Sequence, residues 1–185
     1  MKTLLKNSLL TIVMVFAVTV FFSCESNFKE VQRINSVAFA PSGEADSVDL
    51  KYTDSGKVKA ILVSPKMLDY SNAKYPFTEF PKGIHVTLFD ENQKKSYVDA
   101  DYAITYARTD IIDLQGNVKI TSSDGKLLQT EQLYYDQKNE WFFTEKQFKY
   151  TDEAGGYLEG PGVDFSKDFK VFNMQNSRGE VTKLE

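Results

Sequence analysis

Apolar and polar side chains alternate with a period of two residues through most of the chain, most clearly between residues 102 and 135. A strand with this period places one set of side chains on each face. Turns at 108–110 and 123–126 separate three such runs, and the second turn contains Asp124-Gly125. Asp-Gly between alternating runs favours a hairpin, because a type I′ turn needs positive φ at both central residues. The stretch therefore predicts an antiparallel β-meander with one apolar face.

Turn signals recur along the chain, so the whole domain is predicted to be all-β. Regular turns between alternating runs are typical of a sandwich, barrel or jelly roll. After residue 22 no window has the i, i+3, i+4, i+7 spacing of an amphipathic helix. The predicted turns lie at 54–57, 71–73, 90–93, 108–110, 124–125, 137–139, 152–156, 166–168 and 176–179.

An internal repeat indicates how the strands are arranged. Similar four-residue segments end at Tyr70, Tyr106, Tyr135 and Phe165, which are 36, 29 and 30 residues apart. A period near 30 fits a strand, a turn and a returning strand, stacked on the next such unit. We therefore expect stacked, V-shaped β-layers.

The first 23 residues have the layout of a secretory signal peptide. Lys2 and Lys6 precede an uncharged apolar run from 8 to 22. The run is short for a transmembrane helix, which needs about 20 apolar residues. We expect the signal peptide at 1–23, a membrane tether at 24–46 and the folded domain at 47–185.

Cys24 is the only cysteine, so it has no disulfide partner within the chain. The preceding Phe21-Phe22-Ser23 makes the site similar to a lipobox, where bacterial lipoproteins are cut and lipidated. Two or more acyl chains give stable membrane anchoring. We therefore predict lipidation at Cys24. The alternative is an ordinary signal peptide, or an uncleaved anchor, with an incidental cysteine.

Charge and chemistry exclude several classes of function. Without Lys2 and Lys6 the chain has 20 basic and 26 acidic residues, and no basic run that would suit nucleic acid. His85 is the only histidine, which leaves no His-based triad or paired-His metal site. We expect no catalytic residue, metal or cofactor. Gly160-Pro161-Gly162 predicts a β-bulge or tight bend.

The apolar positions predict an interior that is either a dry core or a lipid-binding groove. A splayed all-β interior can hold one ligand. The groove candidates are Tyr102, Ile104, Tyr106, Leu114, Val118, Ile120, Leu133, Tyr135, Trp141, Phe143 and Phe165. We expect Phe169 and Val171 to line the same interior.

Two segments carry a family resemblance. Residues 114–118 (Leu-Gln-Gly-Asn-Val) and 128–136 (Leu-Gln-Thr-Glu-Gln-Leu-Tyr-Tyr-Asp), with Asp124-Gly125 between them, resemble the β-jelly-roll families of lipopolysaccharide export. Residues 160–164 are similar to the glycine-containing strand that follows in those families. The anchored N-terminus and the order of segments resemble the LptC family, over about residues 48–174.

The resemblance implies a twisted, V-shaped antiparallel β-jelly roll with no catalytic residues, on the periplasmic side of the inner membrane of a Gram-negative-type bacterium. It implies that lipopolysaccharide passes from an inner-membrane ABC transporter complex to a soluble periplasmic jelly-roll bridge protein, with its acyl chains inside the fold. Edge strands would bind the partners by β-augmentation. We place the bridge-protein edge at 169–174, with Phe169, Val171 and Met174 as candidates, and the transporter end at 48–61.

Two rival hypotheses remain. The chain could be a structural or surface-exposed β-sandwich lipoprotein with a closed core. It could instead be an enzyme that acts on cell-wall glycans through Asp99 and Asp101, since paired carboxylates can do acid–base chemistry when one is buried. These carboxylates flank a turn, which favours solvated strand ends.

Overall fold

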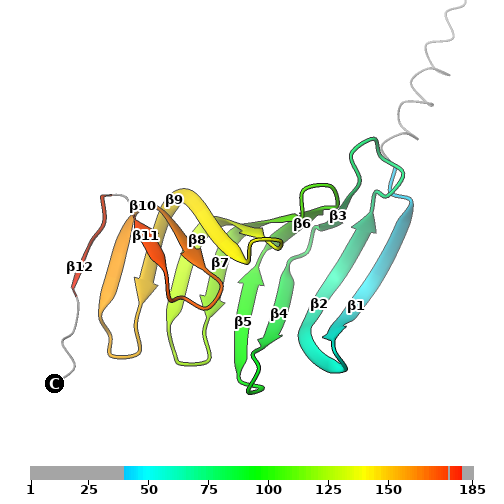
Figure 1. The fold of residues 1–185 in the computed structure, drawn as a ribbon. Coiled ribbons are helices and arrows are strands. Elements are labelled where there is room, and N and C mark those ends of the chain that lie inside the picture. The colour runs from blue at the N-terminus through cyan, green and yellow to red at the C-terminus, as the bar shows by residue number, and fades with distance from the viewer. Residues whose placement is uncertain (1–39, 175, 181–185) are drawn as a thin grey trace, which may run out of the picture. The chain divides into compact units, whose positions relative to one another are not determined.

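The computed structural model describes residues 40–174 and 176–180. The chain forms two compact units, Met1–Ala40 and Pro41–Glu185, and every strand below belongs to the second. All regular structure in the described residues is β, as the alternating pattern predicts (Figure 1). The predicted signal peptide, Cys24 and most of the predicted tether lie outside the described residues. Between residues 40 and 180, residue 175 apart, no helix is long and apolar enough to cross a membrane.

In the described part of the chain, twelve strands form one antiparallel sheet. They are β1 (Gly43–Asp54), β2 (Lys57–Asp69), β3 (Phe77–Phe80), β4 (Ile84–Phe89), β5 (Lys95–Ala100), β6 (Tyr102–Tyr106), β7 (Ile111–Thr121), β8 (Leu127–Asp136), β9 (Trp141–Thr151), β10 (Tyr157–Ser166), β11 (Phe172–Met174) and β12 (Arg178–Glu180). β1 takes in residues 43–46, so the predicted tether extends four residues too far.

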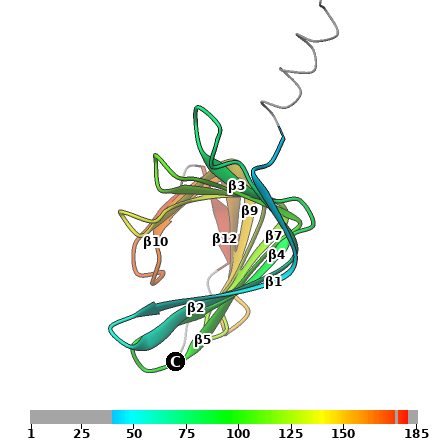
Figure 2. The same ribbon diagram turned by 90° about the vertical axis from the view of Figure 1, so that its right-hand side faces the viewer.

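The long strands bend, and each contributes to two arms. β7 pairs with β6 through residues 111–115 and with β5 through 119–121, while β8 follows β7 on both sides of the bend. β10 likewise pairs with β11 near one end and β12 near the other. We call the part built on β3, β6 and β11 the β6 arm, and the part built on β4, β5 and β12 the β5 arm. Figure 2 shows the two arms diverging as a V.

Bulges and buried hydroxyls form the bends. The β7–β8 register shifts between Gln115 and Val118, where Gly116 has a φ of +73°. The β9–β10 register shifts at Gly162, which has a φ of +99°, so the bend predicted at 160–162 is confirmed. Ser64, Thr130 and Thr144 are buried, and each hydroxyl hydrogen-bonds to backbone two residues further on. These bonds satisfy backbone groups that the bends free from the sheet.

The core lies between the arms. Its buried members are Phe80, Ile84, Val98, Ala100, Ala103, Leu114, Val118, Ile120, Leu128, Leu133, Phe142, Phe148, Val163 and Phe165.

All nine predicted turns fall on a connection between strands, including 176–179, which reaches into β12. Two breaks, at 81–83 and at Asp101, were not predicted from the sequence. The first separates β3 from β4 and the second separates β5 from β6, where one long strand was expected in each case. Tyr70, Tyr106, Tyr135 and Phe165 all lie toward the same end of their layers, which explains the repeat of about 30 residues.

Candidate functional site

The space between the arms is solvent-free toward β10 and open toward β1. Leu128, Leu133 and Phe165 are 0% exposed, and Val118 and Ile120 are nearly so. Toward β1 the apolar side chains are only partly covered. Leu50 is 46% and Tyr52 is 65% exposed. The interior is therefore a packed core at one end and an apolar trough at the other.

The sheet register places the trough residues on one face. Leu50 lies opposite Leu62, and Leu62 opposite Val86. In the next row Tyr52 lies opposite Ala60, which lies opposite Leu88. Paired residues in an antiparallel sheet point to the same face. Since Leu62, Val86 and Leu88 pack against the core, Leu50 and Tyr52 face the interior too.

The trough residues were missed as binding candidates. The signal for them was present, because Val48, Leu50 and Tyr52 alternate with charged residues and threonine. Their exposure depends on β1 being the last strand of the sheet, with no described strand on its outer side. Exposure of that kind cannot be predicted from alternation within one strand.

The eleven predicted groove residues lie on two opposite faces. Leu114, Val118, Ile120, Leu133, Tyr135 and Phe165 belong to the core or pack against it. Tyr102, Ile104, Tyr106, Trp141 and Phe143 face away from it, because their neighbours Ala103 and Phe142 are the inward residues. The expectation that all eleven share one interior is therefore wrong for these five.

The outward face of the β6 arm has its own packing. The buried Asp113 carboxylate accepts hydrogen bonds from the Gln115 and Gln132 amides at 2.8 and 2.9 Å. The ring of Tyr134 stacks on Phe143 with centroids 5.1 Å apart. Trp141 donates to the Asp164 carboxylate at 3.1 Å. Burial raises the pKa of the Tyr102 hydroxyl, and a hydrogen bond to Glu79 raises it further. These contacts give Tyr102, Trp141 and Phe143 a structural role, and Ile104 is itself buried.

The predicted partner-edge residues have different surroundings. Val171 is 49% exposed and is not among the residues that pack against the core, contrary to the expectation that it lines the interior. Met174 lies opposite Val163 and packs against the core. Phe169 also packs inward, so it contributes its ring to the interior. Each end strand leaves one side without a described neighbour: β1 at one end of the sheet, and β11 with β12 at the other.

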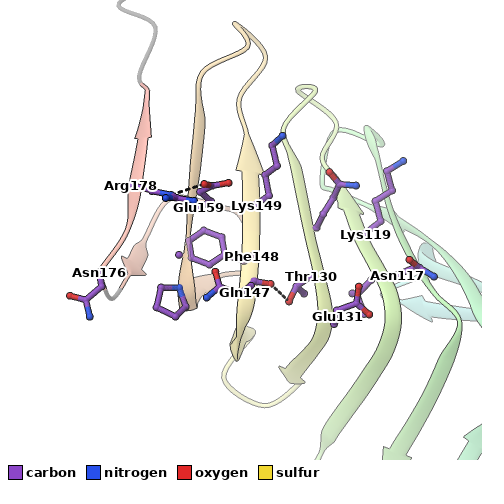
Figure 3. A pocket seen from close by; sticks show the side chains of 14 residues that line it. Asn117, Lys119, Thr130, Glu131, Gln147, Phe148, Lys149, Glu159, Asn176 and Arg178 are labelled. Atoms are coloured by element: carbon purple, nitrogen blue, oxygen red, sulfur yellow. Dashed lines mark hydrogen bonds and ion pairs between the residues drawn. The ribbon is translucent and has the colours of Figure 1, made fainter.

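A hollow of about 850 Å³ lies against the β5 arm near the bends (Figure 3). A row of polar side chains crosses it in register: Lys119, Gln129, Lys149, Glu159 and Arg178. These residues alternate with the core residues Val118 and Phe148, so they face away from the core. Arg178 donates to Glu159 at 2.7 Å. The row holds three cations, one amide and one carboxylate, so the hollow is a polar surface rather than an apolar site.

The two carboxylates weighed for acid–base chemistry have separate partners. Asp99 pairs with His85 at 2.6 Å. Asp101 accepts a hydrogen bond from the Asn117 amide at 2.6 Å. Neither carboxylate is buried, and a catalytic pair needs one that is. Among the described side chains, no group of three or more His, Cys, Asp or Glu could hold a metal ion.

The interior tyrosine Tyr135 makes stability sensitive to high pH. Burial raises its pKa to about 12, and Glu140 and Asp136 add to the rise. Below the unfolded pKa of about 10, both states keep the proton and the stabilisation is complete. As pH rises from 10 to 12, only the unfolded chain ionises, so the folded state loses stability. We expect Tyr135→Phe to lose less stability than the parent chain over this range, measured by urea unfolding at pH 8 and pH 11. Equal losses would contradict the buried hydroxyl.

The chain matches a protein-family model. The model is described as "Lipopolysaccharide-assembly, LptC-related", and the match covers residues 10–180, which is most of the chain. None of the curated proteins matches.

Proposed function

The chain belongs to the LptC family of lipopolysaccharide-assembly proteins and so has a role in lipopolysaccharide transport, and on that premise we propose that the trough between the arms holds lipopolysaccharide acyl chains. The observation that carries the proposal is the set of exposed apolar side chains on the interior face, led by Leu50 and Tyr52. Burying each CH₂ of an acyl chain contributes about 0.8 kcal/mol. A chain lying along the trough would also remove these side chains from water.

The ends of the sheet are suited to relay partners. β1 is twelve residues long, and no described strand pairs with its outer side. A long unpaired edge is an aggregation hazard, and natural proteins usually protect it. We infer that this end faces the inner-membrane ABC transporter complex. The edge formed by β11 and β12, with Val171 exposed beside it, would face the soluble jelly-roll bridge protein by β-augmentation.

The N-terminal segment would anchor the domain. We propose that cleavage after Ser23 and lipidation at Cys24 hold the domain at the periplasmic side of the inner membrane. Residues 24–42 would then form the tether. Mass spectrometry of the mature N-terminus tests this arrangement. A Cys24 start with added acyl mass supports it, and an intact Met1 contradicts it.

A structural lipoprotein with a closed core is the second candidate. The close packing around Leu133 and Phe165 favours it, because both side chains are fully covered by protein in this conformation. This candidate predicts no contact between lipid and the interior. The open half of the same interior favours transport.

Photo-crosslinking tests the transport proposal. We expect p-benzoylphenylalanine in place of Tyr52 to label lipopolysaccharide in cells, since this side chain faces the trough and is mostly exposed. The matched control is the same residue at Lys51, which is the exposed neighbour on the opposite face of β1. Labelling from position 52 alone supports the trough. Equal labelling from both positions, or none from position 52, contradicts it.

A further inference from the structure

A cluster of four aromatic rings joins the two arms near the β10 end. Phe165 and Phe172 belong to the β6 arm, and Tyr150 belongs to the β5 arm. The Phe172 ring lies 4.9 Å from Phe165 and 5.0 Å from Tyr150. Phe169, from the β10–β11 loop, lies 5.0 Å from Phe165 and 6.5 Å from Tyr150. Side chains thus cross the opening of the V and close it at this end.

The closure conflicts with the proposed route of the acyl chains. A chain that enters at the β1 end and leaves toward a partner at β11 and β12 has to pass these rings. Phe165 is a fully buried strand residue, so moving it would disrupt the core. Phe169 lies in a loop and is only partly buried. It is therefore the member of the cluster that can move without unfolding a strand.

The backbone at Phe169 is under strain. Its φ is +58°, which is uncommon for a bulky aromatic residue and costs free energy. The loop hydrogen bonds nearby are local, with Phe169 N donating to Ser166 O at 2.8 Å and Ser166 N donating to Val171 O at 3.0 Å. The loop is linked to β8–β9 by the exposed Lys167–Glu140 pair at 2.8 Å. Ring packing in the cluster offsets the cost of this backbone conformation, so the loop conformation depends on the contacts of the Phe169 ring.

We propose that Phe169 is a gate residue: its ring closes the interior at the β10 end, and an acyl chain displaces it on the way to the bridge protein. This inference rests on the proposed binding of acyl chains between the arms. Figure 2 shows the chain between β10 and β11 curling from the β6 arm toward the space between the arms. The exchange replaces one apolar group by another on Phe165, Phe172 and Tyr150. Opening therefore keeps these three rings covered, and the apolar surface newly exposed to water is that of the Phe169 ring.

Crosslinking at two depths tests the gate in the full chain in cells. Tyr52 marks the open end, and Tyr135 marks the interior next to the aromatic cluster, where its ring lies 4.4 Å from Phe142. Each position would carry p-benzoylphenylalanine, in the parent chain and in Phe169→Ala and Phe169→Gly backgrounds. If the open state is populated at roughly a tenth, removing the ring should raise lipopolysaccharide labelling from position 135 about fivefold to tenfold. Labelling from position 52 should stay unchanged.

Lys170→Ala is the matched control, because Lys170 lies in the same loop and its ammonium pairs only with Asp168 among the described residues. Phe169→Ala keeps a Cβ at a positive φ and could fold poorly for that reason. Phe169→Gly removes the ring without this problem, since glycine adopts positive φ without strain. If labelling from position 135 stays at the Lys170→Ala level in both Phe169 variants while position 52 still labels, the gate is wrong. If position 52 fails to label in the parent chain, the proposed function fails instead.

Discussion

Phe165→Ala is expected to lower the free energy of unfolding by about 3–5 kcal/mol, the range for truncating a fully buried phenylalanine. Phe165 is 0% exposed, and its ring packs on Phe142, Phe169 and Phe172 at centroid distances of 5.1, 5.0 and 4.9 Å. Its strand is paired on both sides, by β9 and β11, so the backbone cannot easily collapse into the cavity. Urea unfolding of the purified protein, followed by circular dichroism, measures the loss.

Phe143→Ala is the matched control for the face assignment. Phe143 lies opposite Asp164, the residue next to Phe165, but it is on the outward face and is 37% exposed. Its truncation removes the stack on Tyr134 and part of its burial, so we expect a loss of about 1–2 kcal/mol. Equal losses for the two variants would contradict the opposite orientation of these phenylalanines.

Local sequence signals predicted the turns, but the two corners at Gly83 and Asp101, where a strand breaks, depend on tertiary contacts. Asp124-Gly125 was predictable because the turn type requires these residue types wherever it occurs. The breaks at Gly83 and Asp101 could not be predicted in this way, because each of these corners packs against a neighbouring layer of the sheet. The Ser64 hydroxyl donates to Gly83 O at 2.7 Å, and Asp101 N donates to Gly116 O at 3.0 Å. Bonds between layers of this kind have no signature within a single strand.

The corner at Asp101 also explains the error in the predicted groove. Val98 and Ala100 face the core, so unbroken alternation would bring Tyr102, Ile104 and Tyr106 inward. The corner adds a step, and Ala103 becomes the inward residue. A shift of one residue moves every following side chain to the other face. The outward positions carry large aromatic residues and the inward position carries a small alanine, so apolar character alone favoured the wrong register.

The apolar interior was predictable, but its open and closed ends were not. Alternation identified Val118, Ile120 and Leu133 as inward residues. Closure depends on Phe169 and Tyr150, which come from different arms and are 19 positions apart in the chain. Opening depends on the position of β1 at the end of the sheet. Both properties follow from strand order, which sequence alternation does not specify.

Gly83→Ala is expected to destabilise the protein by about 3 kcal/mol or more, because it combines backbone strain with a backbone collision. Gly83 has a φ of +81°, and an added Cβ would lie 2.6 Å from Ala100 O and 3.2 Å from Asp101 O. Both oxygens belong to the β5–β6 corner, which is fixed by its own bonds to β7. The methyl group would push neighbouring layers apart at the bend, so we also expect weaker lipopolysaccharide labelling from Tyr52.

Gly56→Ala separates the free-energy cost of backbone strain from that of the collision. Gly56 has a nearly identical φ of +76° in the β1–β2 hairpin, but an added Cβ would meet nothing within 4 Å. It carries the left-handed backbone penalty without the collision, so we expect a loss of about 1 kcal/mol. The difference between the two urea midpoints then measures how rigidly one corner packs on the next. If the two variants lose the same stability, the corner can yield, and the stacked bends would be flexible enough to change the angle between the arms.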